Sequence, residues 1–526
     1  EAAGLALAAG RAARHAAAFP LAFACHQRGL ELAGPDAWTT AYERTRDLHA
    51  GAVEAAYLSA EWDAMAARAA ALKAHARTAL DQMIAWEVEI DACAGRHAYP
   101  AAIAAGRAAL ALLGVELPPV PGAAEIAAAV EGALGELMRL GPAALPGLPD
   151  ADDPEVLAAM RLVVRLSPVA YFGQPSLLPI LAAQIVTTSV RRGLTTATPY
   201  ALALFGLVLN TIDLLPLAHE LGQLAVRLLD RWPDRGLEAA TRHLVFNLVT
   251  PWMQHLAAIL DPLHDVWDLG RRTGDYEYAA YAGHGWVHDC VYVGRPLEPL
   301  YDEALAIGAE MRRLGQVNAL HVHQPFEQLL RGLTGRLPAP PRLDDAGFDE
   351  EAHVAAAARD GSRSGVFIAR LVMGLSRFLL GEPREAFAHL ELARGHVDAA
   401  PSTPHLPVLH QYAALAACAR YAGAGPDERA RLDDVIDGSL EALGKVAAHA
   451  PVNVAHRIEL VQAERARVHG DRDGARRHLE AAIAAARAGD WRLDLAVALE
   501  LAARHHGGDL ADARAAYLAL GASGKL

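Results

Sequence analysis

The chain has 526 residues, too many for one compact hydrophobic core, so it must form several domains or a repeat array with a distributed core. Hydrophobic residues make up 53% of it and aromatic residues only 6%, an Ala- and Leu-rich composition that favours helices and excludes a disordered chain. The formal net charge is -14, and no run of Lys or Arg is dense enough to follow a phosphate backbone, so nucleic-acid binding is disfavoured.

The four cysteines stand far apart in the sequence, and none of them forms a C-x-x-C pair. They are Cys25, Cys93, Cys290 and Cys418. This spacing suggests neither a zinc ribbon nor a disulfide framework. We expect small buried thiols in a reducing compartment, which predicts a cytoplasmic location and no cofactor in this segment.

The N-terminal stretch EAAGLALAAGRAARHAAAF has the apolar character of a targeting peptide, but Arg11, Arg14 and His15 interrupt it at helical spacing. We therefore predict an ordinary amphipathic helix there. No uninterrupted apolar run reaches the roughly 18 to 20 residues that cross a bilayer, so no membrane span is expected. Because the chain opens on Glu1 rather than Met, we expect it to be a segment of a longer polypeptide.

Beyond this stretch, apolar residues recur at i, i+3, i+4 and i+7 almost everywhere, which is the pattern of amphipathic helices. Short helices are joined by tight turns. One helix is predicted to end near Leu58, residues 59–61 turn the chain, and the next apolar stripe begins at Met65. The same pattern returns in SRFLLGEPREAFAHLELARGHV and RARVHGDRDGARRHLEAAIAAAR. The chain therefore contains a repeat.

Each hairpin resembles a tetratricopeptide repeat, in which a turn glycine is followed about five residues later by an alanine where two helices cross closely. Gly381 with Ala386 and Gly470 with Ala475 occupy these positions. One hairpin cannot bury its own apolar stripe, so the units must stack. The prediction is an all-α fold, a right-handed α-α superhelix of tetratricopeptide-like helical hairpins, with its concave face as the binding surface.

Three stretches rich in Pro, Gly and Asp interrupt the helical pattern, at residues 117–122, 141–154 and 337–349. The last of them is the clearest boundary. The sequence thus predicts four parts: N-terminal tetratricopeptide-like repeats at 1–116, an irregular helical block at 117–336, a Pro/Asp-rich connection at 337–350, and C-terminal tetratricopeptide-like repeats at 351–526.

The motifs of nucleotide chemistry are missing from the chain. Val446 follows Gly444-Lys445 where a P-loop needs a hydroxyl, and neither an H-R-D nor a D-F-G motif occurs. In GSRSG, Arg363 stands where a nucleophile elbow needs its serine. We predict no catalytic residue in this segment.

Four segments between about Tyr57 and Gly335 point to a family. They are AAYLSAEWDAM, ALALLGVELP, the run from DPEVLAAMRLVVRL to ALALFGLVL, and RTGDYEYAAYAGHGWVHDCVYVGRPLEPL. This region resembles the helical region of large bacterial signalling proteins that combine a serine/threonine-kinase-like domain, a signal-transduction ATPase module and, often, a sensor histidine kinase. The resemblance implies a relay segment that senses an inducer or a partner, with kinase or ATPase activity in flanking domains of a parent chain.

A pair of histidines raises a metal hypothesis. His284 and His288 lie four residues apart in HGWVHDC, so on a helix both imidazoles share one face. Two further ligands would complete a zinc site, and a metal-dependent helical enzyme is kept as an alternative. The glutamate of an H-E-x-x-H motif is missing, however, and an ordinary packed helix is the favoured interpretation.

A second pair, His321 and His323, is only two residues apart, so a helix points the two rings to different sides while an extended segment lets them share a ligand. Pro325 favours a local irregularity, whereas the family resemblance implies a helix that carries Gln328. These three polar residues are candidates for contact with a ligand or partner.

Tyr276 and Tyr278 are the remaining candidates for a binding surface, because a Gly-Asp turn begins their helix and the two rings project from its first turn. A helix start capped by Asp275 explains the same pattern without a binding role.

Together these features predict a non-catalytic sensor or scaffold segment of a multidomain signalling ATPase or kinase. Its partner would be a protein, a peptide or a small-molecule effector bound on the concave face. The alternative within the same fold is a stand-alone tetratricopeptide adaptor for protein–protein interaction.

Overall fold

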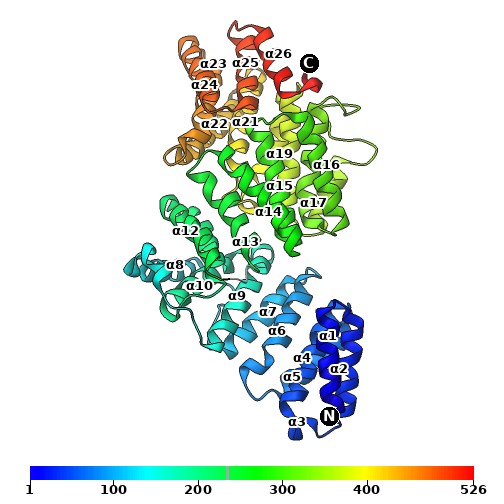
Figure 1. The fold of residues 1–526 in the computed structure, drawn as a ribbon. Coiled ribbons are helices and arrows are strands. Elements are labelled where there is room, and N and C mark those ends of the chain that lie inside the picture. Colours follow the sequence, from blue (N-terminus) through cyan, green and yellow to red (C-terminus); the bar gives the residue numbers. More distant parts are fainter. Residues whose placement is uncertain (233–235) are drawn as a thin grey trace. The chain divides into compact units, whose positions relative to one another are not determined.

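The computed structural model describes residues 1–232 and 236–526, which form two compact units, residues 1–205 and 206–526. The boundary falls inside helix α11 (Thr198–Asn210). The described residues are mostly helical, and their β pairing is limited to one isolated bridge between Asp150 and Leu194 (Figure 1). The predicted all-α fold of stacked helical hairpins is confirmed.

The first unit contains ten complete α-helices, and each packs against the next helix or the next but one in the chain, as α8 does against α10. They are α1 (Ala2–His15), α2 (Phe19–Ala33), α3 (Ala37–Thr40), α4 (Tyr42–Leu58), α5 (Trp62–His75), α6 (Ala79–Ala94), α7 (Tyr99–Leu112), α8 (Ala123–Leu140), α9 (Pro154–Gly173) and α10 (Leu178–Arg192). As predicted, the N-terminal stretch is an amphipathic helix, and the chain turns between α4 and α5 at residues 59–61.

The second unit begins with α12 and short turns and continues as a longer series of hairpins. Its α-helices are α12 (Leu215–Leu228), α13 (Glu238–His243), α14 (Leu260–Thr273), α15 (Tyr276–Val293), α16 (Leu297–Arg313), α17 (Val317–Leu333), α18 (Glu350–Arg359), α19 (Arg363–Leu379), α20 (Pro383–Arg394), α21 (His405–Arg420), α22 (Pro426–Ala447), α23 (Pro451–Val468), α24 (Arg472–Ala488), α25 (Arg492–His505) and α26 (Leu510–Leu520).

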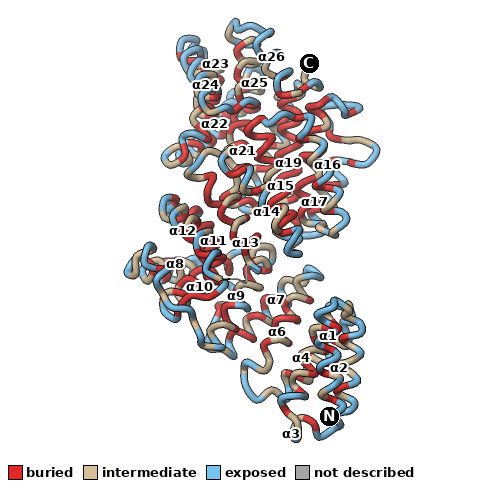
Figure 2. Tube along the Cα trace, viewed as in Figure 1, coloured by how far each residue is buried: buried red, intermediate tan, exposed pale blue. Residues whose placement is uncertain are grey.

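Helices of the second unit alternate between a deeply buried and a more exposed member. Figure 2 shows α15, α19 and α21 buried over most of their length, whereas α16, which packs against α15, and α24, which packs against α23, are exposed over much of theirs. Consecutive buried helices also contact one another across the hairpins. The odd-numbered helices from α15 to α25 therefore form an inner layer, and this layer holds the core of the unit.

The turn chemistry predicted for the hairpins is present. Gly381 and Gly470 both have positive φ, at 110° and 85°, a conformation that glycine adopts without the steric cost of a Cβ. Ala386 and Ala475, five residues later, are completely buried. In the first of these hairpins a Cβ at Gly374 would lie 3.4 Å from the Ala386 carbonyl oxygen, so small residues allow α19 and α20 to cross closely.

Contacts between distant parts of the sequence join the two ends of this series. Asn453 Nδ2 donates to the Pro251 carbonyl at 2.6 Å, and the Asn453 amide oxygen accepts from the Leu256 N–H at 3.0 Å. Gly294, with φ of 86°, ends α15 so close to the start of α25 that a Cβ would lie 2.6 Å from the Leu493 nitrogen. Near the C-terminus Ser523 Oγ donates to the Thr334 carbonyl at 2.9 Å. We call this set of contacts the closing seam.

Each of the three Pro- and Gly-rich stretches is an irregular connection, as predicted. They lie between α7 and α8, between α8 and α9, and between α17 and α18. The last connection lies inside the second compact unit. The four-part division drawn from composition stays a prediction.

One helix, α9 (Pro154–Gly173), bears on the prediction that the chain has no membrane span. This helix has a mean hydropathy of 1.4 over its best 18-residue window and is long enough to cross a bilayer. It is packed in the first unit, however: Arg161 Nε donates to Glu87 of α6 at 3.0 Å, and Arg165 bonds both Glu87 and Asp91. Glu87 is a buried carboxylate, and its ion pairs with Arg161 and Arg165 hold α9 against α6.

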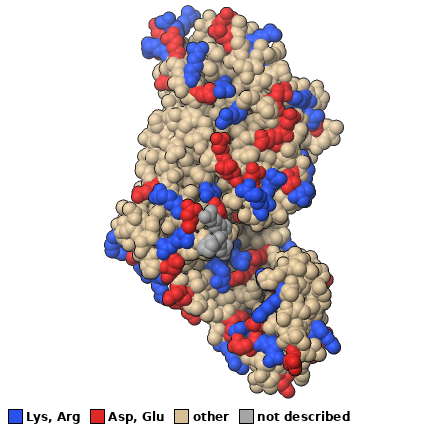
Figure 3. Space-filling model, in the orientation of Figure 1, with Lys and Arg blue, Asp and Glu red and all other residues tan. Residues whose placement is uncertain are grey.

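Charged side chains of both signs are interspersed on the face seen in Figure 3, where no continuous basic surface forms.

Candidate ligand-binding pockets in the second unit

The two histidines of the metal hypothesis lie in the core. His284 and His288 stack on the inner helix α15 with ring centroids 5.2 Å apart, and His288 is fully buried against Phe326 with centroids at 3.8 Å. Neither ring nitrogen of His288 makes a hydrogen bond of normal geometry to a described residue, although the ring has a polar contact with the Val322 backbone. Within residues 1–232 and 236–526, no group of three or more His, Cys, Asp and Glu side chains is arranged to hold a metal ion. The pair packs like other core side chains.

Further imidazoles adjoin this pair. The ring centroids of His405 and His288 lie 5.2 Å apart, and His405 Nδ1 is hydrogen-bonded to the Tyr292 hydroxyl at 2.7 Å. His243 of α13 packs against Tyr281 with ring centroids 5.9 Å apart. Burial lowers the pKa of both His243 and His405 to about 3. Burial and the neighbouring imidazoles hold the pKa of His284 and His288 well below the ordinary value. At neutral pH this histidine cluster is therefore uncharged.

The first turn of α15 places the two candidate tyrosines differently. Tyr276 is 41% exposed, whereas Tyr278 is half-buried and packs against His243 with ring centroids 5.8 Å apart. Asp275 caps the helix through a hydrogen bond from the Tyr278 N–H at 3.4 Å, as the sequence predicted. Burial raises the pKa of Asp275 to about 6. Of the two rings, only that of Tyr276 offers a broad accessible surface.

Helix α17 runs through Pro325, so the predicted local irregularity is absent and the helical alternative holds. The two histidines point to different neighbours: His321 bonds Asp360 at 2.9 Å, and His323 bonds the Ala304 carbonyl at 2.8 Å. The two rings therefore do not share a ligand. Gln328 is half-buried, and its side-chain oxygen has no hydrogen-bond partner among the described residues.

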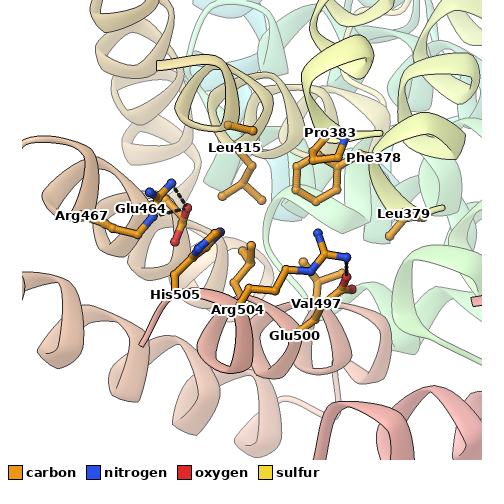
Figure 4. Close-up of a pocket in the computed structure, with 12 residues that line it drawn as sticks. Phe378, Leu379, Pro383, Leu415, Glu464, Arg467, Val497, Glu500, Arg504 and His505 are labelled. Atoms are coloured by element: carbon orange, nitrogen blue, oxygen red, sulfur yellow. Dashed lines mark hydrogen bonds and ion pairs between the residues drawn. The ribbon is translucent and has the colours of Figure 1, made fainter. Parts of the chain in front are cut away.

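The inner helices also form pockets that sequence reasoning missed. The largest of those described here, which we call the charged pocket, has a volume of about 470 Å3 including its open mouth. Side chains from α19, α21, α23 and α25, together with Pro383 at the start of α20, line it. Figure 4 shows Phe378, Pro383 and Leu415 on one side of the pocket and His505 and Arg504 on the other.

The charged pocket is lined by both apolar and charged side chains. The apolar ones include Phe378, Leu415, Val497 and Leu501. The charged ones are Glu464, Arg467, Glu500 and Arg504, with His505 beside them. Arg467 pairs with Glu464 and Arg504 with Glu500, within one helix each (Figure 4). A side chain with an apolar body and a polar end matches such a surface.

Two smaller pockets continue from the charged pocket. The central pocket, of about 270 Å3, shares Leu379 with it, and the tryptophan pocket, of about 360 Å3, shares Val408 and Arg457 with the central one. Trp252 and Trp491 line the tryptophan pocket, and the two indole N–H groups donate to backbone carbonyls. The central pocket thus has lining residues in common with each of the other two.

A buried charged network lies beside the central pocket. Asp494 of α25 accepts hydrogen bonds from Gln411 at 2.8 Å and His456 at 2.8 Å, and Arg457 pairs with it at 3.0 Å. Burial alone would raise the pKa of Asp494, but Arg457 and the two hydrogen bonds outweigh it and lower the pKa below the ordinary value. We call these four residues the aspartate cluster. It joins three consecutive inner helices.

No family model matches the chain, and no curated protein sequence matches it. Among solved structures, the chain is similar to the crystal structure of the APC/C hetero-tetramer Cut9–Hcn1, with a TM-score of 0.33 and 12% sequence identity over 93% of this chain and 95% of that one. A similarity this distant carries no functional argument. The class of the protein, an all-α array of helical hairpins, follows from its own helices.

Proposed function

We propose that the chain is a non-catalytic helical-repeat scaffold or sensor that binds a peptide segment of a protein partner along the pockets of its second unit. One observation carries the proposal: the apolar and charged side chains that line the charged pocket come from four successive inner helices. A repeat array that presents side chains from several units to one ligand is suited to reading an extended segment.

The family resemblance supports a wider context for this proposal. In that context the chain relays a signal inside a multidomain signalling ATPase or kinase, and the partner is a protein, a peptide or a small effector. The reading frame upstream of Glu1 tests the context: an in-frame P-loop and kinase region supports it, and a start codon close to Glu1 supports the stand-alone adaptor.

Binding is tested by selecting a displayed library of random nonapeptides on the purified chain. We expect selected peptides to lose at least about tenfold in affinity when Ala419→Trp fills the charged pocket with an indole. Ala419 lines that pocket and is half-buried, so the larger side chain has room to turn outward.

The matched control is Ala484→Trp, at an exposed position of the outer helix α24. Affinity should stay unchanged in this variant. Equal binding by the wild type and Ala419→Trp would show that the pocket is not the binding site. ATP hydrolysis that stays with the chain through successive purification steps would contradict the non-catalytic assignment.

A further inference from the structure

The tryptophan pocket differs from the charged pocket in presenting mainly rings and hydrocarbon. Its lining includes three prolines and two further side chains that bear on its chemistry: Pro251, Pro404, Pro407, Trp252 and Val446. Pro404 and Pro407 stand at the start of α21, and Val446 lies near the end of α22. A ligand group seated in this pocket therefore meets mostly apolar atoms.

The pocket has little to offer a hydrogen-bond donor of a ligand. Among the described residues that line it, Asn453 alone carries a side-chain acceptor, and this oxygen already accepts from the Leu256 N–H at 3.0 Å. Asn453 Nδ2 is bonded as well, to the Pro251 carbonyl at 2.6 Å and the Gln254 carbonyl at 2.8 Å. A ligand N–H carried into the pocket would leave water without gaining an unoccupied side-chain acceptor, which costs free energy.

The side-chain donors of the pocket are likewise bonded within the chain. Trp252 Nε1 donates to the Ser402 carbonyl at 2.9 Å, and Trp491 Nε1 donates to a backbone carbonyl at 3.0 Å. Arg457 pairs with Asp494 of the aspartate cluster at 3.0 Å. The pocket is therefore suited to an apolar group that brings no N–H of its own.

Trp252 is the aromatic ring that the pocket offers to a ligand. It is half-buried, and no ring or cation of the described residues packs on it, whereas Trp491 is 1% exposed and stacks on His456 at 4.9 Å. Ser402, whose carbonyl holds the Trp252 indole, has a positive φ of 61° and accepts from Asn210 Nδ2 at 3.0 Å. A residue held in so strained a conformation indicates that the orientation of the indole is fixed before a ligand binds.

Proline is the residue whose chemistry matches these conditions. It has no backbone N–H, so its burial leaves no unpaired donor, and its ring packs on aromatic side chains in grooves that recognise extended peptides. Its fixed φ also reduces the conformational entropy that the peptide loses on binding. Leucine or phenylalanine would bring an apolar side chain together with a backbone N–H.

We propose that the tryptophan pocket binds one proline residue of the partner peptide, with the pyrrolidine ring packed on the indole of Trp252. The inference rests on the proposed function and adds the chemistry of an anchor residue.

The test uses the nonapeptides selected on the wild-type chain, in which we expect one position to be Pro. Replacing that Pro by Ala, which restores the N–H and removes the ring, should weaken binding by about tenfold in fluorescence anisotropy. Leu, which is larger and apolar but has the N–H, should lose a similar amount. N-methylalanine, which lacks the N–H, should bind at least about threefold more tightly than Ala.

The first protein variant is Trp252→Leu, which keeps an apolar side chain and removes the indole ring. The preference for Pro over Ala should fall to about twofold or less. Trp286→Leu is the matched control: Trp286 of α15 is also half-buried, packs against His264 and lies outside the three pockets. This control should keep the full preference for Pro.

A second variant decides the question if Trp252→Leu does not fold. Val446 is half-buried in the pocket lining, and Val446→Phe adds a ring there, so the Pro-bearing peptides should bind about tenfold more weakly. Val317→Phe, at a position of α17 that is 48% exposed, should leave their affinity unchanged.

Selected peptides without a common Pro, or peptides that bind equally well with Ala or Leu in its place, overturn the proline anchor. N-methylalanine that binds no better than Ala overturns it too, because the missing N–H would then have no role. A full Pro preference in Trp252→Leu, or full affinity in Val446→Phe, also overturns it. In each of these cases, binding blocked by Ala419→Trp still supports the proposed function, whereas insensitivity of all peptides to Ala419→Trp contradicts that function itself.

Discussion

The histidine cluster and the aspartate cluster are both buried in the second unit, yet their polar atoms are paired very differently. In the aspartate cluster, Asp494 accepts from Gln411 and His456 and pairs with Arg457. In the histidine cluster, His288 has no hydrogen bond at either ring nitrogen, and His243 has none at Nδ1, within the part of the chain that the structure describes. A buried group with charged and hydrogen-bonding partners, such as Asp494, can stay ionised. A buried imidazole without such partners is held in its neutral form.

The largest effect should come from breaking the paired cluster. Asp494→Ala leaves the Arg457 guanidinium buried without its carboxylate, and removal of one partner of a buried ion pair costs about 3 to 5 kcal/mol. Urea unfolding followed by circular dichroism measures this loss.

A carboxylate on the surface provides the control. Asp437 pairs with Arg465 at 2.8 Å and is 55% exposed, so Asp437→Ala should cost no more than about 1 kcal/mol. If the two variants lost equal stability, the aspartate cluster would not be the buried, desolvated pair described above.

Lowering the pH should destabilise the folded chain through the histidine cluster. The pKa of His243 is about 3 in the folded chain and 6.5 in the unfolded one, so the unfolded state binds more protons between these values. Stability from this neutral imidazole is complete above pH 6.5 and falls by about 1.4 kcal/mol per pH unit below it. His243→Phe removes the titration, and at pH 5.5 the wild type should therefore lose about 1 kcal/mol more than the variant, relative to pH 7.5.

Groups that titrate in the same way in the wild type and in His243→Phe do not contribute to the difference between their pH dependences. Asp289 is one of them: burial raises its pKa well above the ordinary value, so it contributes to the pH dependence with the opposite sign. Equal pH dependence of the two unfolding free energies would show that His243 is not held neutral by burial.

The smallest effect is expected at His288. Because neither of its ring nitrogens has a hydrogen bond of normal geometry to a described residue, His288→Leu removes only the polar contact with the Val322 backbone and replaces a desolvated imidazole by hydrocarbon of similar size. The free energy of unfolding at pH 7.5 should change by less than about 1 kcal/mol. A loss above about 2 kcal/mol, measured in the same urea titration, would show that the imidazole has a polar role.

The sequence was sufficient for the local elements of the fold. Helical periodicity predicted the hairpins, and Gly381 and Gly470 stand at turns with the positive φ that glycine permits. The Asp275 cap is likewise a local interaction, between residues three apart. Features of this kind depend on neighbouring residues, which any window of the sequence contains.

The candidate site could not be predicted in the same way. Glu464 and Glu500 look like ordinary charged residues on amphipathic helices, and only the packing of α23 against its neighbours buries Glu464 beside Phe378 and Leu415. A signal was present, since Asp494 interrupts a stretch of α25 that is otherwise apolar on the buried face. The sequence does not say which partners Asp494 finds, because Gln411 and His456 lie tens of residues away.

The closing seam bears on how the second unit folds. Asn453 meets Pro251 across 202 positions, and Ser523 meets Thr334 across 189. A regular repeat array gains stability from nearest neighbours and grows one unit at a time, whereas these contacts form only after nearly the whole unit has been synthesised. The closing seam therefore gives the second unit a higher contact order than a repeat array with nearest-neighbour contacts alone. We expect the early and late hairpins that it joins to fold and unfold together.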